Sequence, residues 1–422
     1  MSLAALHRTK GLTSIVLALA AFSLLPVGLA QPPASTLHDM DENRLREIRP
    51  RLQELTDKQQ VPGVVYLVAH HGRIVAHDAV GMANVEDRKP MQKDSIFQIM
   101  SMTKNFTGVA IMMLVEEGKI DLKSPIEDYL PKFKGILVEE KSPDGKITTH
   151  PPQFKPTVWQ LMDHTSGLDG DPSGDLADNP RSLRVPLAEA VKFYGKGPLR
   201  FEPGTRWSYS NMGIATLGRI IEVVSGQDYV SFISDRLLKP LGMKDSFFLA
   251  PAEKKDRIAL VYKHVDDKLV RSGGEVLAGD PALYRAGARY PAPEFGLYST
   301  APDLFRFYQM LLNYGTFDGK RYLSRQSIET MTRVFTPDVK PSGWMGGTGY
   351  GLTFEIVNQS EGTLQLHSPG TYGHGGAFGT AGWIDPKNDL IRIMLVQVSD
   401  ASAEIPTSIV MQMGEAAVLD GK

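Results

Sequence analysis

Hydrophobic residues repeat with two different periods along the chain. Apolar and β-branched residues at 63–69 and 74–80 are separated by His71-Gly72, which predicts a β-hairpin. From residue 102 onward the apolar positions follow helical spacing, and Gly118 stands where a helix-terminating glycine is expected. Helical patterns then dominate the middle of the chain, where the predicted helices are 158–162, 187–193, 211–225, 229–238, 303–314 and 324–334.

The tail returns to strand-like patterns and closes with a helix. The predicted strands are 363–367, 380–385 and 390–398, with a turn at 386–389 and a final helix at 408–419. Because strands stand at both ends, the simplest arrangement is an α/β (α+β) fold. It has one antiparallel sheet from the N- and C-terminal segments, flanked by helices, and a mostly helical second lobe.

We expect residues 31–422 to form a single unit. Its α/β lobe would comprise 31–110 and 290–422, and its helical lobe 111–289, with a site in the cleft between them. Asp144-Gly145 predicts the turn of an inserted hairpin, and 169–179 a polar loop.

The first thirty residues predict a targeting segment. Arg8 and Lys10 precede an apolar run at 15–29, and small residues stand at 28–30. This is the pattern of a signal peptide cleaved near Ala30, which predicts a periplasmic or secreted protein. The run has about 15 residues, fewer than the ~20 that span a bilayer, so an uncleaved membrane anchor is the less favoured alternative. No other membrane span is expected.

Composition excludes several chemistries. The chain has no cysteine, which rules out a thiol nucleophile, disulfides and cysteine-ligated zinc. Its formal net charge is −2 with both signs interspersed, so no nucleic-acid partner is expected. His70-His71 lacks the companion residues of common metal motifs. We therefore expect a solvated pair at the hairpin tip, no metal site and no cofactor.

Ser101-Met102-Thr103-Lys104 is the first candidate for chemistry. A serine hydroxyl needs a base within hydrogen-bond reach, and positions i and i+3 of a helix share a face. The helix start also offers N–H groups to a developing anion. Burial would lower the pKa of Lys104 toward a value suited to accepting a proton. The alternative is a helix-capping serine followed by a surface lysine.

Two later segments carry further candidates. Tyr209 precedes a predicted helix and could act as a second base or proton shuttle, while Asn211 could donate to a substrate carbonyl. A core tyrosine and an N-cap asparagine are the alternatives. Residues 373–379 combine His374 with several glycines at a predicted strand, which indicates close approach by a ligand or another backbone. The alternative there is a tight bend with a structural histidine.

The order and spacing of these three segments resemble the serine β-lactamase and penicillin-recognising superfamily, which uses S-x-x-K, then Y-x-N, then a glycine-containing strand. The resemblance runs from about residue 62 to 397 and is closest to the class C β-lactamase-like branch, with family VIII carboxylesterases and D-amino-acid peptidases. Linking segments that share it are 97–100, 116–122, 164–168, 203–205, 240–243 and 299–304. It implies a β-lactamase/transpeptidase-like fold.

The resemblance also implies roles for the catalytic residues. Ser101 would be the nucleophile, and Lys104 and Tyr209 would form the proton-transfer pair. The backbone N–H groups of Ser101 and Ala377 would form the oxyanion hole. Asn211 matches the asparagine that contacts an amide side chain in β-lactamases.

The glycine-rich segment departs from the β-lactamase pattern. His374 stands where β-lactamases and penicillin-binding proteins have a lysine that helps hold a substrate carboxylate. Gly375 replaces the usual hydroxyl residue, and Gly376 completes the substrate-binding triplet. These departures weaken the case for a dedicated β-lactamase.

The sequence therefore predicts a serine hydrolase that forms an acyl-enzyme on small-molecule esters or amides, most simply a carboxylesterase. A β-lactamase or a D-stereospecific peptidase are alternatives within the same chemistry. A penicillin-recognising sensor, a cell-wall scaffold and a structural protein that reuses the fold are alternatives outside it. The sequence leaves open the physiological substrate, the oligomeric state, and whether Lys104 or Tyr209 takes the first proton.

Overall fold

The computed structural model describes residues 39–171, 185–272, 288–336, 343, 346–359 and 366–419. These residues belong to one compact unit, Asp39–Lys422. The predicted signal peptide at 1–30, most of the predicted loop at 169–179 and the first part of the predicted strand at 363–367 lie outside the described residues.

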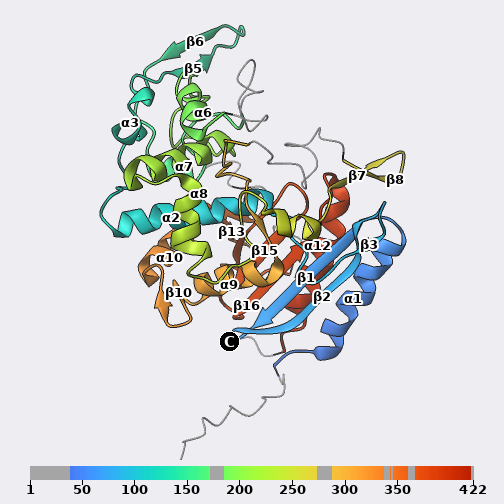
Figure 1. Cartoon of the computed structure of the whole chain (residues 1–422). Helices are drawn as coiled ribbons and strands as arrows, with labels where there is room; N and C mark the ends of the chain where they lie inside the picture. The colour runs from blue at the N-terminus through green and yellow to red at the C-terminus, as the bar shows by residue number, and fades with distance from the viewer. Residues whose placement is uncertain are drawn as a thin grey trace, which may run out of the picture. The chain divides into compact units, whose positions relative to one another are not determined.

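An eight-stranded antiparallel sheet is the centre of the fold, in the order β12-β13-β14-β15-β16-β1-β2-β3. Strand β16 lies beside β1, with Val65 opposite Leu395, so the first and last strands are central neighbours (Figure 1). This confirms the sheet predicted from the two ends of the chain. The strand bounds are β1 Gly63–His70, β2 Arg73–Asn84, β3 Lys89–Pro90, β12 Thr348–Tyr350, β13 Glu355–Val357, β14 Tyr372–Gly375, β15 Ala381–Asp385 and β16 Leu390–Leu395.

Helices cover both faces of the sheet. Helices α1 (Glu42–Asp57) and α12 (Glu404–Ala416) pack with one set of β1 side chains, namely Val64, Tyr66 and Val68. The alternate β1 residues Val65, Leu67 and Ala69 join the core of α2 (Thr103–Glu116) and α9 (Ala301–Leu312). Successive residues of a strand point to opposite faces, so β1 is buried on both sides.

The second lobe is mostly helical (Figure 1). Its helices are α3 Ile126–Tyr129, α4 Val158–Met162, α6 Leu187–Tyr194, α7 Asn211–Ser225 and α8 Tyr229–Ile233. The Asp144-Gly145 turn joins β5 (Val138–Lys141) to β6 (Ile147–His150), as predicted. The remaining elements are helix α10 Arg325–Met331, strands β4 Phe97–Gln98 and β9 Tyr298–Ser299, and the hairpins β7 Tyr262–Val265 with β8 Lys268–Arg271 and β10 Thr316–Phe317 with β11 Lys320–Arg321.

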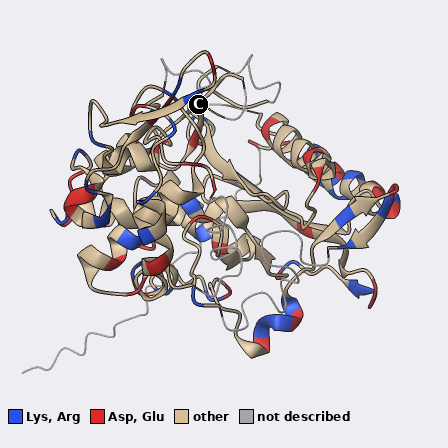
Figure 2. Ribbon diagram, turned by 90° about the horizontal axis from the view of Figure 1, so that it is seen from above, with Lys and Arg blue, Asp and Glu red and all other residues tan. Residues whose placement is uncertain are grey.

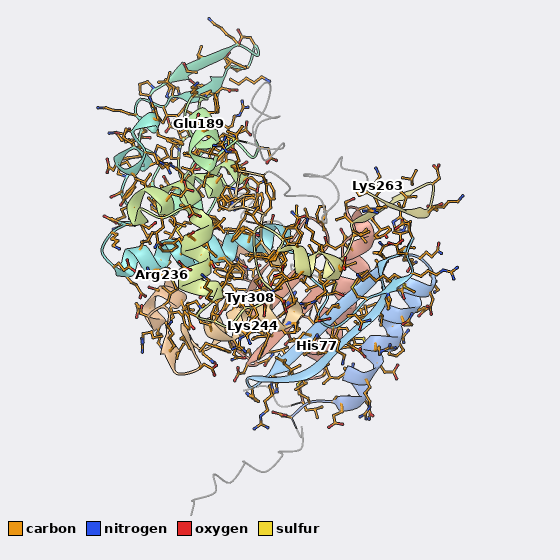
Figure 3. All side chains as sticks on the ribbon, viewed as in Figure 1. His77, Glu189, Arg236, Lys244, Lys263 and Tyr308 are labelled. Carbon is orange, nitrogen blue, oxygen red and sulfur yellow. The ribbon has the colours of Figure 1, made fainter. Side chains whose placement is uncertain are left out.

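Close packing joins α9 to the sheet. Tyr308 of α9 lies in the interior (Figure 3) and is fully buried. A Cβ at Gly382 of β15 would lie 2.3 Å from the Tyr308 ring, so glycine is the residue that permits this contact. This contact fixes the sheet against α9. The candidate active site lies beside β14 and β15 of the same sheet.

The surface carries both charge signs on the same elements (Figure 2). Helix α1, for example, carries acidic and basic residues, and Arg46 pairs with Glu42 while Lys58, directly after the helix, pairs with Glu54. Within the described part of the chain, no helix is both long and apolar enough to cross a bilayer.

Some predictions need correction. Helix α1 was not located from its sequence, and α12 begins at Glu404, four residues before the predicted start at 408. Leu366 and His367 do not lie in a strand. The expected solvated His70-His71 pair is wrong for His70, which is only 3% exposed because it ends β1 and is covered by neighbouring turns.

Candidate active site

The backbone before Ser101 is held from two sides. Strand β4 pairs with β9, and the Ile99 N–H donates to the Leu297 carbonyl at 3.0 Å. On the other side, the Thr380 hydroxyl donates to the Ile99 carbonyl, also at 3.0 Å. Met100 then takes a left-handed conformation with φ +51°, and a 3-10 turn over Met100–Met102 leads into α2. Ser101 therefore stands at a fixed helix start, and its side chain is partly open to a cavity.

Lys104 lies directly beneath the serine. Its Nζ is 3.1 Å from Ser101 Oγ, as expected for positions i and i+3 at a helix start. The same nitrogen is 2.8 Å from Asn211 Oδ1 and 2.8 Å from the Glu294 backbone carbonyl. The alternative of a surface lysine is wrong, because the Lys104 side chain is fully buried.

Burial sets the protonation of this lysine. Loss of hydration lowers the pKa of Lys104 to about 7, and the carboxylates of Glu294 and Asp171 only partly oppose that shift. Both atoms that fix its Nζ besides the serine are neutral carbonyl oxygens, and neutral acceptors stabilise an ammonium less than a directly paired carboxylate does. A substantial fraction of Lys104 is therefore neutral amine near neutral pH.

Tyr209 approaches the serine from the helical lobe. Its hydroxyl hydrogen-bonds with the Ser101 side chain, and its ring centroid lies 4.7 Å from Lys104 Nζ. The ring is partly open to the cavity, yet the dense packing around it raises the pKa of Tyr209 well above 10 despite the Ser101 hydrogen bond. Tyr209 is therefore a protonated phenol near neutral pH.

Asn211 links the serine helix to the helical lobe. The N-cap of α7 is Ser210, whose hydroxyl accepts from the Gly213 N–H, so the interpretation of Asn211 as an N-cap is wrong. The Asn211 amide is instead divided between Lys104, which donates to Oδ1, and Asp171, whose Oδ1 accepts from Nδ2 at 3.0 Å. These two hydrogen bonds fix the Asn211 amide, which in turn helps to hold the Lys104 amine in place.

The glycine-rich segment closes the other side of the cavity. A Cβ at Gly376 would lie 2.5 Å from the Ile99 carbonyl oxygen, so glycine there allows the end of β14 to approach the serine turn. The Gly376 N–H donates to the Thr380 carbonyl at 2.7 Å, toward β15. Ala377 follows in a turn and is exposed at the cavity. Among the described residues its N–H has no hydrogen-bond partner.

His374 is held by bonds within the protein. Its Nδ1 lies 2.6 Å from the Gly375 carbonyl and therefore donates, so Nε2 accepts from the Tyr350 hydroxyl at 2.9 Å. Burial, followed by the charge of Lys104, lowers the pKa of His374 to about 3. A neutral histidine with both nitrogens occupied supplies no positive charge to a substrate carboxylate.

The candidate residues surround one cavity of about 800 Å³. Its lining includes every site residue predicted from the sequence except Lys104, which lies beneath Ser101: Ser101, Tyr209, Asn211, His374, Gly375, Gly376 and Ala377. Among the described residues that line it, the charged side chains are the carboxylates of Asp171, Glu355 and Glu404. The electrostatic character of this described lining is therefore acidic.

Sequence reasoning missed residues that support the site. The buried ring of His164 lies 4.5 Å from the Tyr209 ring and 4.8 Å from the Tyr350 ring, and its Nδ1 accepts from the Ser210 N–H. It positions the tyrosine without reaching the serine. Its segment at 164–168 was noted only for its likeness to the superfamily. The contact of Lys104 with the Glu294 carbonyl could not be predicted from the sequence, because every residue type has a backbone carbonyl.

Comparisons with known proteins agree with this geometry. The family model described as Beta-lactamase matches residues 48–407. The chain belongs to the Beta-lactamase family. It is 31% identical over 361 residues to an uncharacterized protein of Mycobacterium tuberculosis, covering 82% of this chain and 88% of the relative. It is 26% identical over 385 residues to Esterase EstB of Burkholderia gladioli, covering 85% and 92%.

A solved structure shares the Beta-lactamase-family fold. "EstCE1, a hydrolase with promiscuous acyltransferase activity" superposes with a TM-score of 0.72 over 89% of this chain and 99% of that chain, at 21% identity. The family resemblance and the fold predicted from the sequence are thus confirmed, and the chain is a hydrolase of the Beta-lactamase family.

Proposed function

We propose that this protein is a serine carboxylesterase that forms its acyl-enzyme on Ser101 and prefers substrates without a free carboxylate. The observation that carries the proposal is the buried Lys104 amine, 3.1 Å from Ser101 Oγ and fixed otherwise by neutral carbonyls. A lysine with a pKa of about 7 is suited to remove the serine proton near neutral pH.

In the proposed reaction, neutral Lys104 accepts the Ser101 proton as Oγ bonds to the ester carbonyl carbon. The N–H groups of Ser101 and Ala377 hold the resulting oxyanion. Tyr209, hydrogen-bonded to the serine, delivers a proton to the leaving alkoxide as the C–O bond breaks and is reprotonated by the Lys104 ammonium. Water then attacks the acyl-enzyme by the reverse relay, releasing the acid and restoring Ser101.

The charges around the cavity support the ester preference. His374 is neutral and bonded at both nitrogens, and Asp171, Glu355 and Glu404 supply negative charge. Like charges repel by about 3 kcal/mol at 5 Å and an effective dielectric of 20. A substrate carboxylate would meet this repulsion, whereas a neutral ester would not. Gly375 adds room, because a Cβ there would have only the Thr380 carbonyl nearby, at 3.8 Å.

A matched substrate panel tests the preference. We expect kcat/KM for p-nitrophenyl acetate to exceed by at least about tenfold the values for p-nitrophenyl hydrogen succinate, a cephalosporin and D-alanyl-D-alanine, which all carry a free carboxylate. The succinate monoester is the matched member, because its scissile ester bond is the same. Higher kcat/KM for the carboxylate-bearing members would contradict the ester assignment and favour a peptidase or β-lactamase.

The Ser101→Ala variant tests the nucleophile. Loss of a serine nucleophile removes nearly all turnover in other hydrolases, so we expect kcat to fall by about 10⁴-fold or more with the circular dichroism spectrum unchanged. Mass spectrometry with a fluorophosphonate provides the control, since the wild-type protein gains one adduct and Ser101→Ala none. A stable adduct on wild-type protein that turns over no ester would instead support a sensor.

We also propose that the protein is exported. The support is the Arg8, Lys10 and apolar 15–29 pattern, which has the composition of a signal peptide. N-terminal sequencing of protein recovered from a bacterial host tests it, with a start at or near Gln31 expected and an intact Met1 contradicting cleavage.

A further inference from the structure

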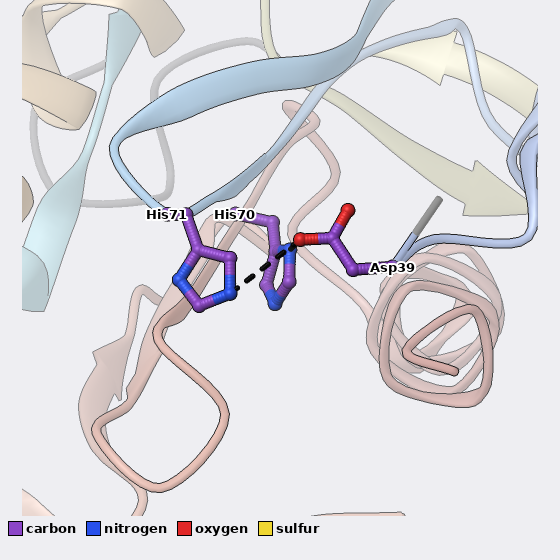
Figure 4. Close-up of side chains that lie close together, drawn as sticks. All are labelled: Asp39, His70 and His71. Carbon is purple, nitrogen blue, oxygen red and sulfur yellow. Dashed lines mark ion pairs between the residues drawn. The ribbon is translucent and has the colours of Figure 1, made fainter. Parts of the chain in front are cut away.

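Three ligand-type side chains converge at the tip of the β1–β2 hairpin (Figure 4). His70 Nδ1 lies 3.3 Å from Asp39 Oδ2, and His71 Nε2 lies 3.5 Å from the same oxygen. The three ligand atoms are all within 4.8 Å of one another. None of these residues lines the cavity around Ser101, so the cluster is separate from the candidate active site.

The backbone brings the two neighbouring histidines to one side. Adjacent residues of a regular strand point to opposite faces, but His71 leaves β1 in a left-handed conformation with φ +49°. As a result the two imidazole centroids are only 3.9 Å apart. Asp39 is held in place from the other end of the chain, because the Leu419 N–H donates to its carbonyl at 2.9 Å.

Hydrogen bonds on the far side of the rings direct their free nitrogens inward. Asp389 Oδ2 lies 2.9 Å from His71 Nδ1, and a carboxylate only accepts, so Nδ1 carries the proton. In the neutral ring, Nε2 then presents a lone pair toward the Asp39 carboxylate. His70 is also hydrogen-bonded to the backbone carbonyl of Asn388, and its side chain is buried. An imidazole lone pair and a carboxylate oxygen repel each other, and a metal cation between them relieves that repulsion, as a second ring proton also would.

Two of the three distances between ligand atoms fit a tetrahedral ion. Zinc binds imidazole nitrogen at about 2.0–2.1 Å and carboxylate oxygen at about 2.0–2.2 Å, which places two tetrahedral ligand atoms about 3.3–3.5 Å apart. The two nitrogen–oxygen distances here are 3.3 and 3.5 Å, both longer than a strong charged hydrogen bond. We propose that Asp39, His70 and His71 bind one zinc ion, with water at the fourth position.

The surroundings match the outer shell of such a site. Metal-bound histidines donate their second nitrogen to a carboxylate or a backbone carbonyl, which fixes the ring. Here the Asp389 carboxylate accepts a hydrogen bond from His71, and the Asn388 carbonyl is hydrogen-bonded to the His70 ring. The ion would join the segment before α1, the β1–β2 turn and the β15–β16 turn. Its role would be to stabilise a chain that has no disulfides.

Zinc titration of the full chain tests the proposal. After removal of metal by a chelator, we expect calorimetry at about pH 7.5, where free histidine is mostly neutral, to show one Zn²⁺ bound per chain. We also expect a saturable rise in melting temperature. Mg²⁺ serves as the control ion and should have no effect, because it prefers oxygen ligands. The activity of the enzyme toward esters is not the readout.

Matched variants assign the ligands. His71→Gln, at a half-exposed position, is expected to abolish the zinc response while the protein stays folded by circular dichroism. Asp389→Asn is expected to weaken zinc binding by about 10–100-fold. His264→Gln is the control, because His264 also contacts a carboxylate, that of Asp400, but does not belong to a group of three ligand-type side chains among the described residues.

Three results would overturn the site. The first is a wild-type protein that binds no Zn²⁺ at this stoichiometry, and the second is a folded His71→Gln variant with unchanged zinc affinity. The third is equal weakening by His264→Gln, which would show that surface histidines, rather than this cluster, hold the ion.

Discussion

Two buried cations in this protein have opposite surroundings. Lys104 lies beneath Ser101 and is held by the serine hydroxyl and two neutral carbonyl oxygens. Arg392 of β16 is equally buried, between the sheet and α12, but its Nη1 pairs with the Glu415 carboxylate at 2.8 Å and with the Met411 carbonyl at 2.8 Å. The first cation lacks a directly bonded carboxylate, and the second has one.

The difference separates a residue that can exchange a proton from one that cannot. Burial without a bonded carboxylate lowers the pKa of Lys104 to about 7. A guanidinium keeps its proton at every physiological pH, so Arg392 stays charged and needs its carboxylate partner. Burial alone therefore does not indicate whether a basic side chain can exchange its proton or only stabilises the fold. The type of its hydrogen-bond partners does.

Lys104→Met is the strongest test of the proposed role of Lys104 as the general base. Removal of a general base is expected to lower kcat/KM by about 10²–10⁴-fold. Because the folded state disfavours the Lys104 charge, losing the amine offsets part of the loss of its hydrogen bonds. The free energy of unfolding is therefore expected to stay within about 2 kcal/mol of wild type. Ester kinetics measure kcat/KM, and urea denaturation measures the free energy of unfolding. A large loss of stability would show that Lys104, like Arg392, has a mainly structural role.

Arg392→Met is the converse test. It leaves Glu415 buried without its partner, and breaking such a pair costs about 3–5 kcal/mol while the carboxylate stays charged. Burial raises the pKa of Glu415 to about 7 even beside Arg392, so the loss is expected to be largest at alkaline pH and smaller near neutral pH, where the carboxyl takes up a proton. The activity per folded molecule is expected to stay near wild type. The matched control is Arg392→Met combined with Glu415→Gln, which removes the stranded charge and is expected to recover much of the stability in urea denaturation.

The pH dependence of ester hydrolysis reports the protonation of Lys104. The folded-state pKa of Lys104 is lowered from 10.5 to about 7, so the reactive amine is present above that pH and lost below it. We expect kcat/KM to be constant above about pH 8 and to fall about 100-fold by about pH 5, tenfold per unit. A profile that is flat between these values would mean that Lys104 does not take the serine proton.

Tyr350→Phe has the smallest expected effect. It removes the donor to His374 Nε2, and a neutral hydrogen bond is worth about 0.5–1.5 kcal/mol. If His374 only shapes the cavity, kcat/KM is expected to fall by no more than about tenfold. A loss as large as that of Lys104→Met would show that His374 takes part in proton transfer.

Much of the fold could be predicted from local patterns. Hydrophobic periodicity predicts the sheet formed by the N- and C-terminal segments and the helices α2, α7 and α9. Helix-terminating glycines add to it, as does Gly226, which adopts φ +72° after α7. Helix α1 was missed because it is rich in charged residues and contains Pro50, so its few buried positions give a weak pattern. The early start of α12 depends on a 3-10 turn capped by Asp400.

The candidate site was predictable where residue type carries the chemistry. Ser101, Lys104 and Tyr209 were selected by side-chain reactivity and spacing, and the structure brings them together. The roles of Asn211 and His374 depend on which neighbours occupy their polar atoms, namely Asp171 and Tyr350. Those contacts are between segments far apart in the sequence, so no local pattern contains them.

The pairing of β1 with β16 has a consequence for biogenesis. The two central strands come from opposite ends of the polypeptide, so a ribosome has released nearly all of it before they can meet. Such non-local pairing makes acquisition of the native state slow. Until then the apolar β1 segment remains without its partner strand, and such an unpaired apolar segment is prone to aggregation.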